Sequence, residues 1–222
     1  MKYPPGYYLL PWTSVLAALS WGLFEVAAVI SESEARSLDD RVILLMRQTD
    51  HPERLIGPLS LEEAVRDFTA LGGYAVLVTI TICFAAFARA ELGRDMFRFF
   101  VVTVVGGFLS GVVLKELVQR HRPSIVPHLS HVSGSTSFPS SHAMMSVIVY
   151  VTIGLLLAQL SRSPALRHLL IGLPFGVSLL VGVSRVCMGV HFPSDVLAGW
   201  TFGLMWIWAM FALRGRRLSI KT

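Results

Sequence analysis

Three short stretches of the sequence carry side chains suited to phosphate chemistry, and each adjoins the end of an apolar segment. They cover residues 115–123 (KELVQRHRP), 139–142 (PSSH) and 184–195 (SRVCMGVHFPSD). Cations bind phosphate oxygens, while imidazoles transfer protons or act as nucleophiles. The combination indicates a phosphatase built into a membrane. The groups that could do this chemistry are Lys115, Arg122, Arg185, His142, His191 and Asp195.

The composition is that of an integral membrane protein. Hydrophobic residues make up 54% of the 222 residues and charged residues only 15%, which leaves too little polar surface to cover a soluble globule. The formal net charge of +5 comes without a Lys/Arg-rich stripe interleaved with aromatic residues, so we expect no nucleic-acid partner. Positive residues that flank membrane spans explain the charge better.

Six apolar stretches predict six membrane-spanning helices, because lipid offers no hydrogen-bond partner to an open strand. Several stretches are shorter than the ~20 residues of a full span, so flanking residues must extend them or the bilayer must be thin locally. We expect an all-α, six-transmembrane-helix bundle that forms a single domain over residues 1–222, with its core at 97–213. The stretches are 8–30, 74–88, 99–114, 143–160, 169–183 and 196–213.

The first of these stretches also resembles a signal peptide, because Lys2 precedes it and small residues follow. It is longer than the apolar region of an ordinary signal peptide. We therefore expect it to be retained as a span.

Residues 31–73 connect the first two stretches and predict two short amphipathic helices at the membrane interface. Pro52 and Pro58 separate the two helices and disfavour a continuous one. The segment could shape substrate access or simply connect two spans. Its apolar residues recur at helical spacing, as Leu38, Val42, Leu45 and Met46 and then as Leu61, Ala64, Val65 and Phe68.

The loops between the stretches predict the orientation of the bundle, because basic residues favour the cytoplasmic side. The acid-rich segment 31–73 then lies on the opposite face, and both termini are cytoplasmic. Counting spans places all three motifs together on the outer face. The basic residues of the inner side are Lys2, Arg89, Arg94, Arg98, Arg162, Arg167, Arg214, Arg216, Arg217 and Lys221.

In the first motif, Lys115 and Arg122 are seven residues apart, which is two helical turns, so both could reach one anion. Pro123 disfavours helical backbone at Arg122, so we expect the helix to end just before it and the guanidinium to approach from the loop. Arg120 and His121 are interpreted as ordinary interfacial charges.

In the second motif, Ser140 and Ser141 precede an apolar run and form an N-cap signature. A helix N-terminus attracts phosphate. His142, in the first turn, could donate a proton to a leaving oxygen. Capping alone would also explain the serines, and a structural role would explain an isolated histidine.

In the third motif, Arg185 can bind phosphate, His191 can attack phosphorus, and Asp195 can hold the imidazole in the attacking tautomer. Pro193 is expected to begin the last helix. That start places Asp195 in the first turn and His191 on the loop before it, where a hydrogen bond between them is feasible. A helix-start charge is the alternative explanation of Asp195.

We predict no metal or other cofactor. His128 and His131 have a spacing that metal ligands use, but no third ligand accompanies them. Cys83 and Cys187 lie far apart, so a disulfide is not expected.

Together the motifs resemble the three-part signature of the type-2 phosphatidate phosphatase superfamily, also called lipid phosphate phosphatases. With the layout of the spans, the resemblance covers residues 99–213. Many members have glycine where this chain has Ser141, but serine is a familiar variant whose backbone N–H can still face phosphate. The matching residues are Lys115, Arg122, Pro123, Pro139, Ser140, His142, Ser184, Arg185, His191 and Asp195.

The resemblance implies a metal-independent hydrolase with a phosphohistidine intermediate. It implies His191 as nucleophile, Asp195 as its partner and His142 as general acid. The implied phosphate ligands are Lys115, Arg122, Ser140 and Arg185, and Ser141 is added to them as a further candidate.

Three functions compete at this stage. The first is hydrolysis of a lipid phosphate monoester or diphosphate, such as phosphatidate, phosphatidylglycerophosphate, undecaprenyl diphosphate or a lipid A type. The second is a phosphotransferase that uses the same histidine. The third is a non-catalytic lipid-binding or transport bundle, which is disfavoured because binding alone would need only the cations. The compact chain resembles bacterial members, so we expect the bacterial cytoplasmic membrane; the oligomeric state is not predicted.

Overall fold

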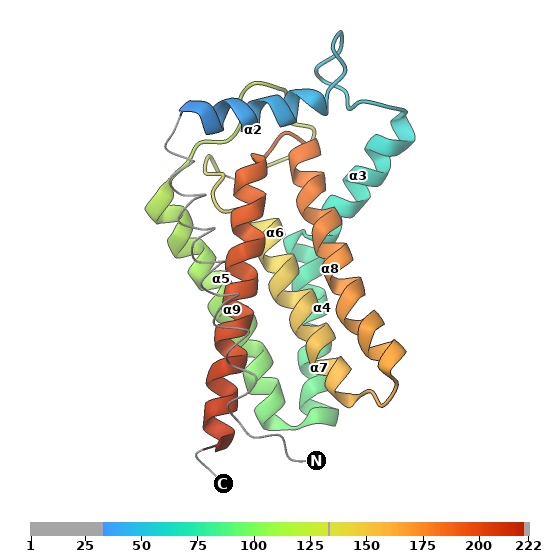
Figure 1. Ribbon diagram of the computed structural model, residues 1–222, viewed down its shortest axis with the longest axis vertical. Coiled ribbons are helices and arrows are strands. Elements are labelled where there is room, and N and C mark those ends of the chain that lie inside the picture. Colours follow the sequence, from blue (N-terminus) through green and yellow to red (C-terminus); the bar gives the residue numbers. More distant parts are fainter. Residues whose placement is uncertain (1–32, 133, 220–222) are drawn as a thin grey trace.

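A computed structural model describes residues 33–132 and 134–219, and its regular structure within those ranges is helical (Figure 1). In this part of the chain the only strand-like pairings are two isolated bridges, Arg47 with Leu55 and His121 with Thr136. The predicted all-α class is confirmed. The elements are α2 (Ser33–Leu45), α3 (Leu59–Leu71), α4 (Tyr74–Phe87), the π-helical turn η1 (Ala88–Leu92), α5 (Arg94–Val118), α6 (Ser141–Ser146), the π-helical turn η2 (Val147–Val151), α7 (Thr152–Leu160), α8 (Pro164–Cys187) and α9 (Pro193–Ser219).

Five helical segments of the described ranges are long and apolar enough to cross a membrane, at 19 to 25 residues each. The sequence predicted shorter apolar stretches, and flanking residues extend them as expected. The sixth predicted span, 8–30, lies outside the described residues. The five segments are Tyr74–Leu92, Arg94–Val118, Ser141–Leu160, Pro164–Cys187 and Pro193–Gly215.

The continuous helix Ser141–Leu160 forms the centre of the bundle, because 67% of its apolar window is buried. Helix α9 packs closely against it. A Cβ atom on Gly199 would lie 2.8 Å from the backbone oxygen of Ser140, so only glycine permits this approach. Trp206 donates from Nε1 to the backbone oxygen of Thr103 at 2.8 Å and so ties α9 to α5.

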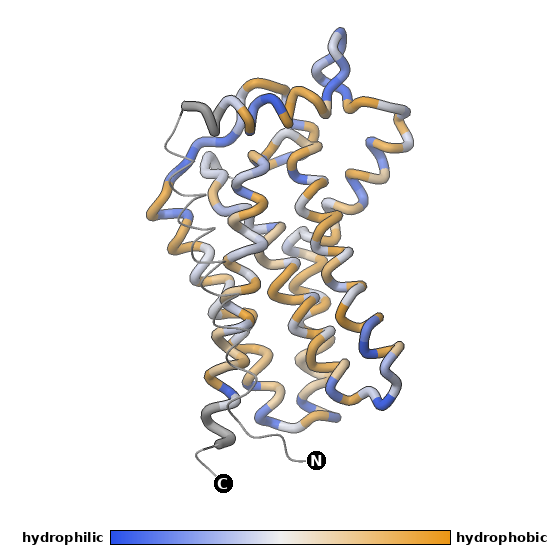
Figure 2. Tube along the Cα trace, viewed as in Figure 1, coloured by the Kyte–Doolittle hydropathy of each residue, from blue (hydrophilic) through white to orange (hydrophobic). Residues whose placement is uncertain are grey.

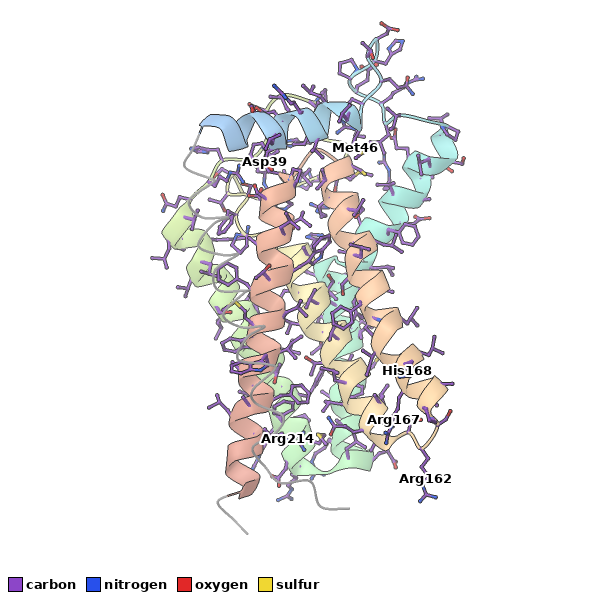
Figure 3. All side chains as sticks on the ribbon, viewed as in Figure 1. Asp39, Met46, Arg162, Arg167, His168 and Arg214 are labelled. Carbon is purple, nitrogen blue, oxygen red and sulfur yellow. The ribbon has the colours of Figure 1, made fainter. Side chains whose placement is uncertain are left out.

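Helix α2 lies across one end of the bundle, and α3 runs obliquely from the same end (Figure 1). The two predicted helices of the 31–73 segment are therefore present; their location at the membrane interface stays a prediction. The long helices are mostly apolar, and hydrophilic residues concentrate at the two ends (Figure 2). Figure 3 places Asp39 at the α2 end and Arg162, Arg167 and Arg214 at the opposite end.

The sequence expected Leu38, Val42, Leu45 and Met46 to form the apolar stripe of α2. Leu38 and Leu45 are 61% and 71% exposed, whereas Val42 packs against the buried cluster that contains Ile43, so only part of the stripe faces away from the protein. The side of α2 that packs on the bundle also carries Asp39 and Ile43, and Arg47 follows two residues after the end of the helix; all three are buried. An apolar stripe facing outward is the arrangement that a helix on a lipid surface requires.

Candidate active site

The ends of four helices bring the three motifs together beneath α2. Helices α5 and α8 end there, at Val118 and Cys187, while α6 and α9 begin there, at Ser141 and Pro193. His142 lies within electrostatic range of four other titratable or charged groups of the site. These groups are Arg185, His191, Arg122 and Lys115.

His191 is buried in the loop before α9, and its ring is flanked by a carboxylate. Nδ1 of His191 lies 3.6 Å from Oδ2 of Asp195, which is longer than a formed hydrogen bond. The same Oδ2 accepts a hydrogen bond from the backbone N–H of Phe192 at 2.9 Å. Pro193 begins α9 and places Asp195 in its first turn, as the sequence predicted.

The opposite nitrogen of His191 faces Arg122. Nη1 of Arg122 donates to Nε2 of His191 at 3.2 Å and to the backbone oxygen of Val190 at 2.8 Å. A guanidinium can only donate, so Nε2 is the acceptor and the proton of the neutral ring is on Nδ1, toward Asp195. The lone pair of Nε2 therefore points to the cationic side of the site.

Burial lowers the pKa of His191 to about 4, and the positive charges of Arg185 and Arg122 act in the same direction, while Asp195 opposes them. The imidazole is consequently neutral near pH 7. Burial also lowers the pKa of Arg122, but a guanidinium stays protonated throughout the physiological range.

Arg185 reaches the site from the last turn of α8 and is held by α3. Its Nη1 donates to Oγ1 of Thr69 at 3.1 Å, and Ser184 donates to the same oxygen at 2.9 Å. Nε of Arg185 is buried and has no hydrogen-bond partner among the described residues. Sequence reasoning missed Thr69, which carries no motif signal.

Ser140 is the N-cap residue of α6, as predicted, but its side chain does not cap the helix. Its hydroxyl is buried with no partner in the described part of the chain. The backbone N–H of Ser140 donates to the backbone oxygen of Asp195 at 3.0 Å and joins the second and third motifs. Ser141 and His142 follow in the first turn and are half-buried. The free hydroxyl, the open helix start and Nε of Arg185 suit a phosphate group.

The first motif largely follows the expected geometry. Helix α5 ends at Val118, where Gln119 adopts a left-handed backbone conformation. The helix therefore ends before Arg122, as predicted, but three residues earlier than its immediate neighbour, so Lys115 and Arg122 do not share two turns of one helix. Arg122 reaches the site from the following loop, as predicted, and is held there also by a hydrogen bond from Nε to the backbone oxygen of Gly134 at 3.1 Å. Lys115 lies 3.5 Å from the backbone oxygen of Thr136.

The interpretation of Arg120 as an ordinary interfacial charge is wrong. Its side chain is buried and forms salt bridges with Asp39 and Asp195. The neighbouring His121 is exposed, as expected.

No group of three or more His, Cys, Asp or Glu residues within 33–132 and 134–219 lies close enough to hold a metal ion. His128 is held by its own loop, where Nε2 lies 2.8 Å from the backbone oxygen of Pro123.

An apolar groove of about 430 Å³ runs along α4, α5 and the central helix. Tyr74 lines it, and the Tyr74 ring centroid lies 6.3 Å from that of His142. At Tyr74 the wall of the groove therefore comes close to His142 of the polar site. Other residues of its wall are Leu77, Val78, Val105, Phe108 and Val149.

The family model described as the PAP2 superfamily matches residues 95–219, which is more than half of the chain. The chain belongs to the PAP2 superfamily. PAP2 is the type-2 phosphatidate phosphatase superfamily that the motifs indicated, and the chain is accordingly a membrane lipid phosphatase, an enzyme that hydrolyses phosphate esters. Metal independence is consistent with this superfamily.

Sequence similarity to two bacterial or archaeal phosphatases and to one crystal structure supports membership of the PAP2 superfamily. Phosphatidylglycerophosphatase B of Bacillus subtilis is 31% identical over 88% of this chain and 91% of its own length. Undecaprenyl-diphosphatase of Sulfolobus acidocaldarius is 31% identical over 60% of each chain. The crystal structure of a PAP2-type phosphatidylglycerolphosphate phosphatase from Bacillus subtilis aligns with a TM-score of 0.77 at 28% identity, covering 90% of this chain and 96% of that one.

The PAP2 match contains every site residue that the sequence proposed, from Lys115 to Asp195. It leaves out the segment that carries α2 and α3. Asp39 and Thr69 of that segment nevertheless bond to Arg120 and Arg185. Helices α2 and α3 therefore contact two arginines that belong to the first and third motifs.

Proposed function

We propose that this PAP2 enzyme hydrolyses a lipid phosphate monoester or diphosphate through a phosphohistidine on His191. The observation that carries the proposal is the orientation of the ring. Nε2 of His191 presents its lone pair to Arg122, while Nδ1 faces Asp195. A neutral imidazole with this tautomer is a nucleophile whose developing positive charge has a carboxylate beside it.

The first step forms a bond from Nε2 of His191 to phosphorus and breaks the bond from phosphorus to the leaving oxygen. Arg122, Arg185, Lys115 and the Ser140 hydroxyl bind the other phosphate oxygens, assisted by the start of α6 with Ser141. Protonated His142 gives its proton to the leaving oxygen, and Asp195 stabilises the positive ring of His191.

The second step returns the enzyme to its starting state. Water attacks phosphorus, His142 accepts one proton from that water, and the bond between phosphorus and Nε2 breaks. Inorganic phosphate leaves, and His191 is again neutral. If a lipid or sugar hydroxyl replaced the water, the same steps would give a phosphotransferase.

We propose phosphatidylglycerophosphate as the first substrate to test, because the relative that aligns over most of both chains is named for it. The apolar groove beside Tyr74 suits the hydrocarbon chains of such a lipid. Phosphatidate, undecaprenyl diphosphate and lipid A type phosphates share the same headgroup chemistry. We place the site on the outer face of a bacterial cytoplasmic membrane, with both termini in the cytoplasm.

The test uses the purified enzyme in detergent and measures free phosphate released from each of these lipids. His191→Ala should abolish release, whereas His168→Ala, at the far end of the bundle (Figure 3), should retain it. Brief reaction with a ³²P-labelled substrate should label the protein in an acid-labile form only when His191 is present. Full activity of His191→Ala would exclude the proposed mechanism, and label recovered in a second lipid would identify a transferase.

A further inference from the structure

One buried guanidinium joins two carboxylates from opposite ends of the sequence. Nη2 of Arg120 donates to Oδ2 of Asp39 at 2.8 Å, and its Nη1 donates to Oδ1 of Asp195 at 2.7 Å. Asp39 and Arg120 are 6% and 8% exposed, and Asp195 is fully buried. The bonds connect helix α2, the loop after α5 and the first turn of α9.

Asp39 also binds the start of α9 directly. Its Oδ1 accepts from the backbone N–H of Ser194 at 3.0 Å, and its Oδ2 accepts from the Ser194 hydroxyl. A carboxylate at this place satisfies a free N–H of the first turn and interacts favourably with the helix dipole. Asp39 is thus an N-terminal cap supplied by a different helix.

Arg120 is fixed from several sides. Its Nη1 donates a second hydrogen bond to the Ser194 hydroxyl at 2.7 Å, and its guanidinium lies 4.1 Å from the centroid of the Phe192 ring. Its backbone oxygen accepts from the N–H of Ser137 at 2.7 Å. The guanidinium therefore has a single position between the two carboxylates.

This arrangement determines the orientation of Asp195. Oδ1 is bonded to Arg120, and Oδ2 is bonded to the N–H of Phe192 and faces Nδ1 of His191. A carboxylate anchored at both oxygens cannot rotate its charge away from the imidazole. Without the Asp39 carboxylate, the guanidinium of Arg120 would be bonded to Asp195 as its only carboxylate. The guanidinium would then be held less firmly, and so would Oδ1 of Asp195, which it binds.

We propose that Arg120 and Asp39 are positioning residues for the reaction, and that α2 orients Asp195 through them. The inference rests on the proposed function, because it needs His191 and Asp195 to act as a pair. It assigns a role to Asp39, which lies outside the PAP2 match. The alternative is that the same bonds only dock α2 on the bundle.

The test compares Asp39→Asn with Asp40→Asn, a neighbouring half-buried residue of the same helix. Asp39→Asn keeps the size of the side chain but loses the charge, so we expect kcat to fall about ten- to hundred-fold with KM within about twofold. Asp40→Asn should match the parent enzyme. Asp39→Glu, which keeps the carboxylate, should recover part of the lost kcat. Rates are expressed per folded enzyme, counted in the monodisperse peak of a gel-filtration column.

A double-variant cycle separates positioning from docking. Arg120→Lys keeps the charge but loses the fork, so it should also lower kcat with little change in KM. Adding Asp39→Asn to Arg120→Lys should then lower kcat by less than about twofold more, because both changes interrupt one path. If the losses of kcat in Asp39→Asn and Arg120→Lys multiplied in the double variant, the inference would be overturned. It would also be overturned if these variants melted at a lower temperature but kept the parent kcat per folded enzyme.

His191→Ala, run beside these variants, distinguishes the two proposals. An inactive His191→Ala with a fully active Asp39→Asn would overturn the positioning role alone. An active His191→Ala would overturn the proposed function itself.

Discussion

Arg122 donates from Nη1 to Nε2 of His191 across 3.2 Å, so the group suited to bind phosphate also holds the lone pair suited to attack it. The same Nη1 is bonded to the backbone oxygen of Val190, and Nε to that of Gly134. These two backbone bonds can keep the guanidinium in place when an arriving phosphate takes over its contact with Nε2. The nucleophile would then be released only in the presence of the anion.

Arg122→Lys should therefore lower kcat/KM by at least about a hundredfold, because a lysine replaces the planar fork by a single point charge. Phosphate release at low substrate concentration measures the effect. Arg167→Lys, in an exposed position at the opposite end of the bundle (Figure 3), is the matched control and should be silent. An Arg122→Lys enzyme within tenfold of the parent would show that the fork is not needed.

The lowered pKa of His191 predicts a dependence of stability on pH. Burial lowers the pKa of His191 to about 4 in the folded protein, whereas the unfolded chain has the ordinary histidine pKa of 6.5. Between these values the unfolded chain binds a proton that the folded chain does not, so the contribution of His191 is fully present above pH 6.5 and is lost as pH falls toward 4. Melting temperatures measured across this range should fall less steeply for His191→Gln than for the parent. Equal slopes would contradict the prediction.

Much of the fold was predictable because it depends on composition and local sequence. The apolar stretches gave the helices, and Pro193 gave the start of α9. The three motifs were found because their residues stand close together along the chain. Pro123 likewise predicted that α5 ends before Arg122. The exact end was less accessible, because no residue type indicates that Gln119 adopts the left-handed conformation that follows Val118.

The supporting contacts of the site could not be predicted. Asp39 and Arg120 are 81 residues apart, and Thr69 and Arg185 are 116 apart. Nothing in the local sequence of either pair specifies its partner. The division of the α2 stripe, with Leu38 and Leu45 exposed and Val42 packed on the core, could not be predicted either, because exposed and buried apolar residues look alike in a sequence.

Thr69→Val should weaken anion binding without removing any group from the phosphate site. The substitution keeps the shape but leaves Nη1 of Arg185 without its hydroxyl partner. A hydrogen bond to a charged group contributes about 1.5–3 kcal/mol, so the inhibition constant for vanadate should rise about tenfold or more. Thr79→Val, which removes an exposed hydroxyl on α4, should leave the inhibition constant for vanadate unchanged. A silent Thr69→Val would remove α3 from the account of the site.

Gly199→Ala should destabilise the protein by forcing α9 away from α6. The new Cβ atom would lie 2.8 Å from the backbone oxygen of Ser140 and 3.2 Å from Cβ of Ala143. Overpacking of this kind costs about 1–3 kcal/mol. Gly172→Ala, where no atom lies within 4 Å, should melt at the parent temperature or above it. A Gly199→Ala variant as stable as Gly172→Ala would show that the helices can separate freely.

Filling the apolar groove should discriminate between substrates by chain length. Val105 lines the groove, and Val102, on the same helix, is 55% exposed and does not. If hydrocarbon chains lie in the groove, Val105→Trp should raise KM for a long-chain lipid phosphate by about tenfold, since burial of each CH₂ contributes about 0.8 kcal/mol. Hydrolysis of a short-chain, water-soluble analogue should change little, and Val102→Trp should affect neither. Equal losses on both substrates would mean that the tryptophan disturbs the polar site, and no loss on either would mean that the chains lie elsewhere.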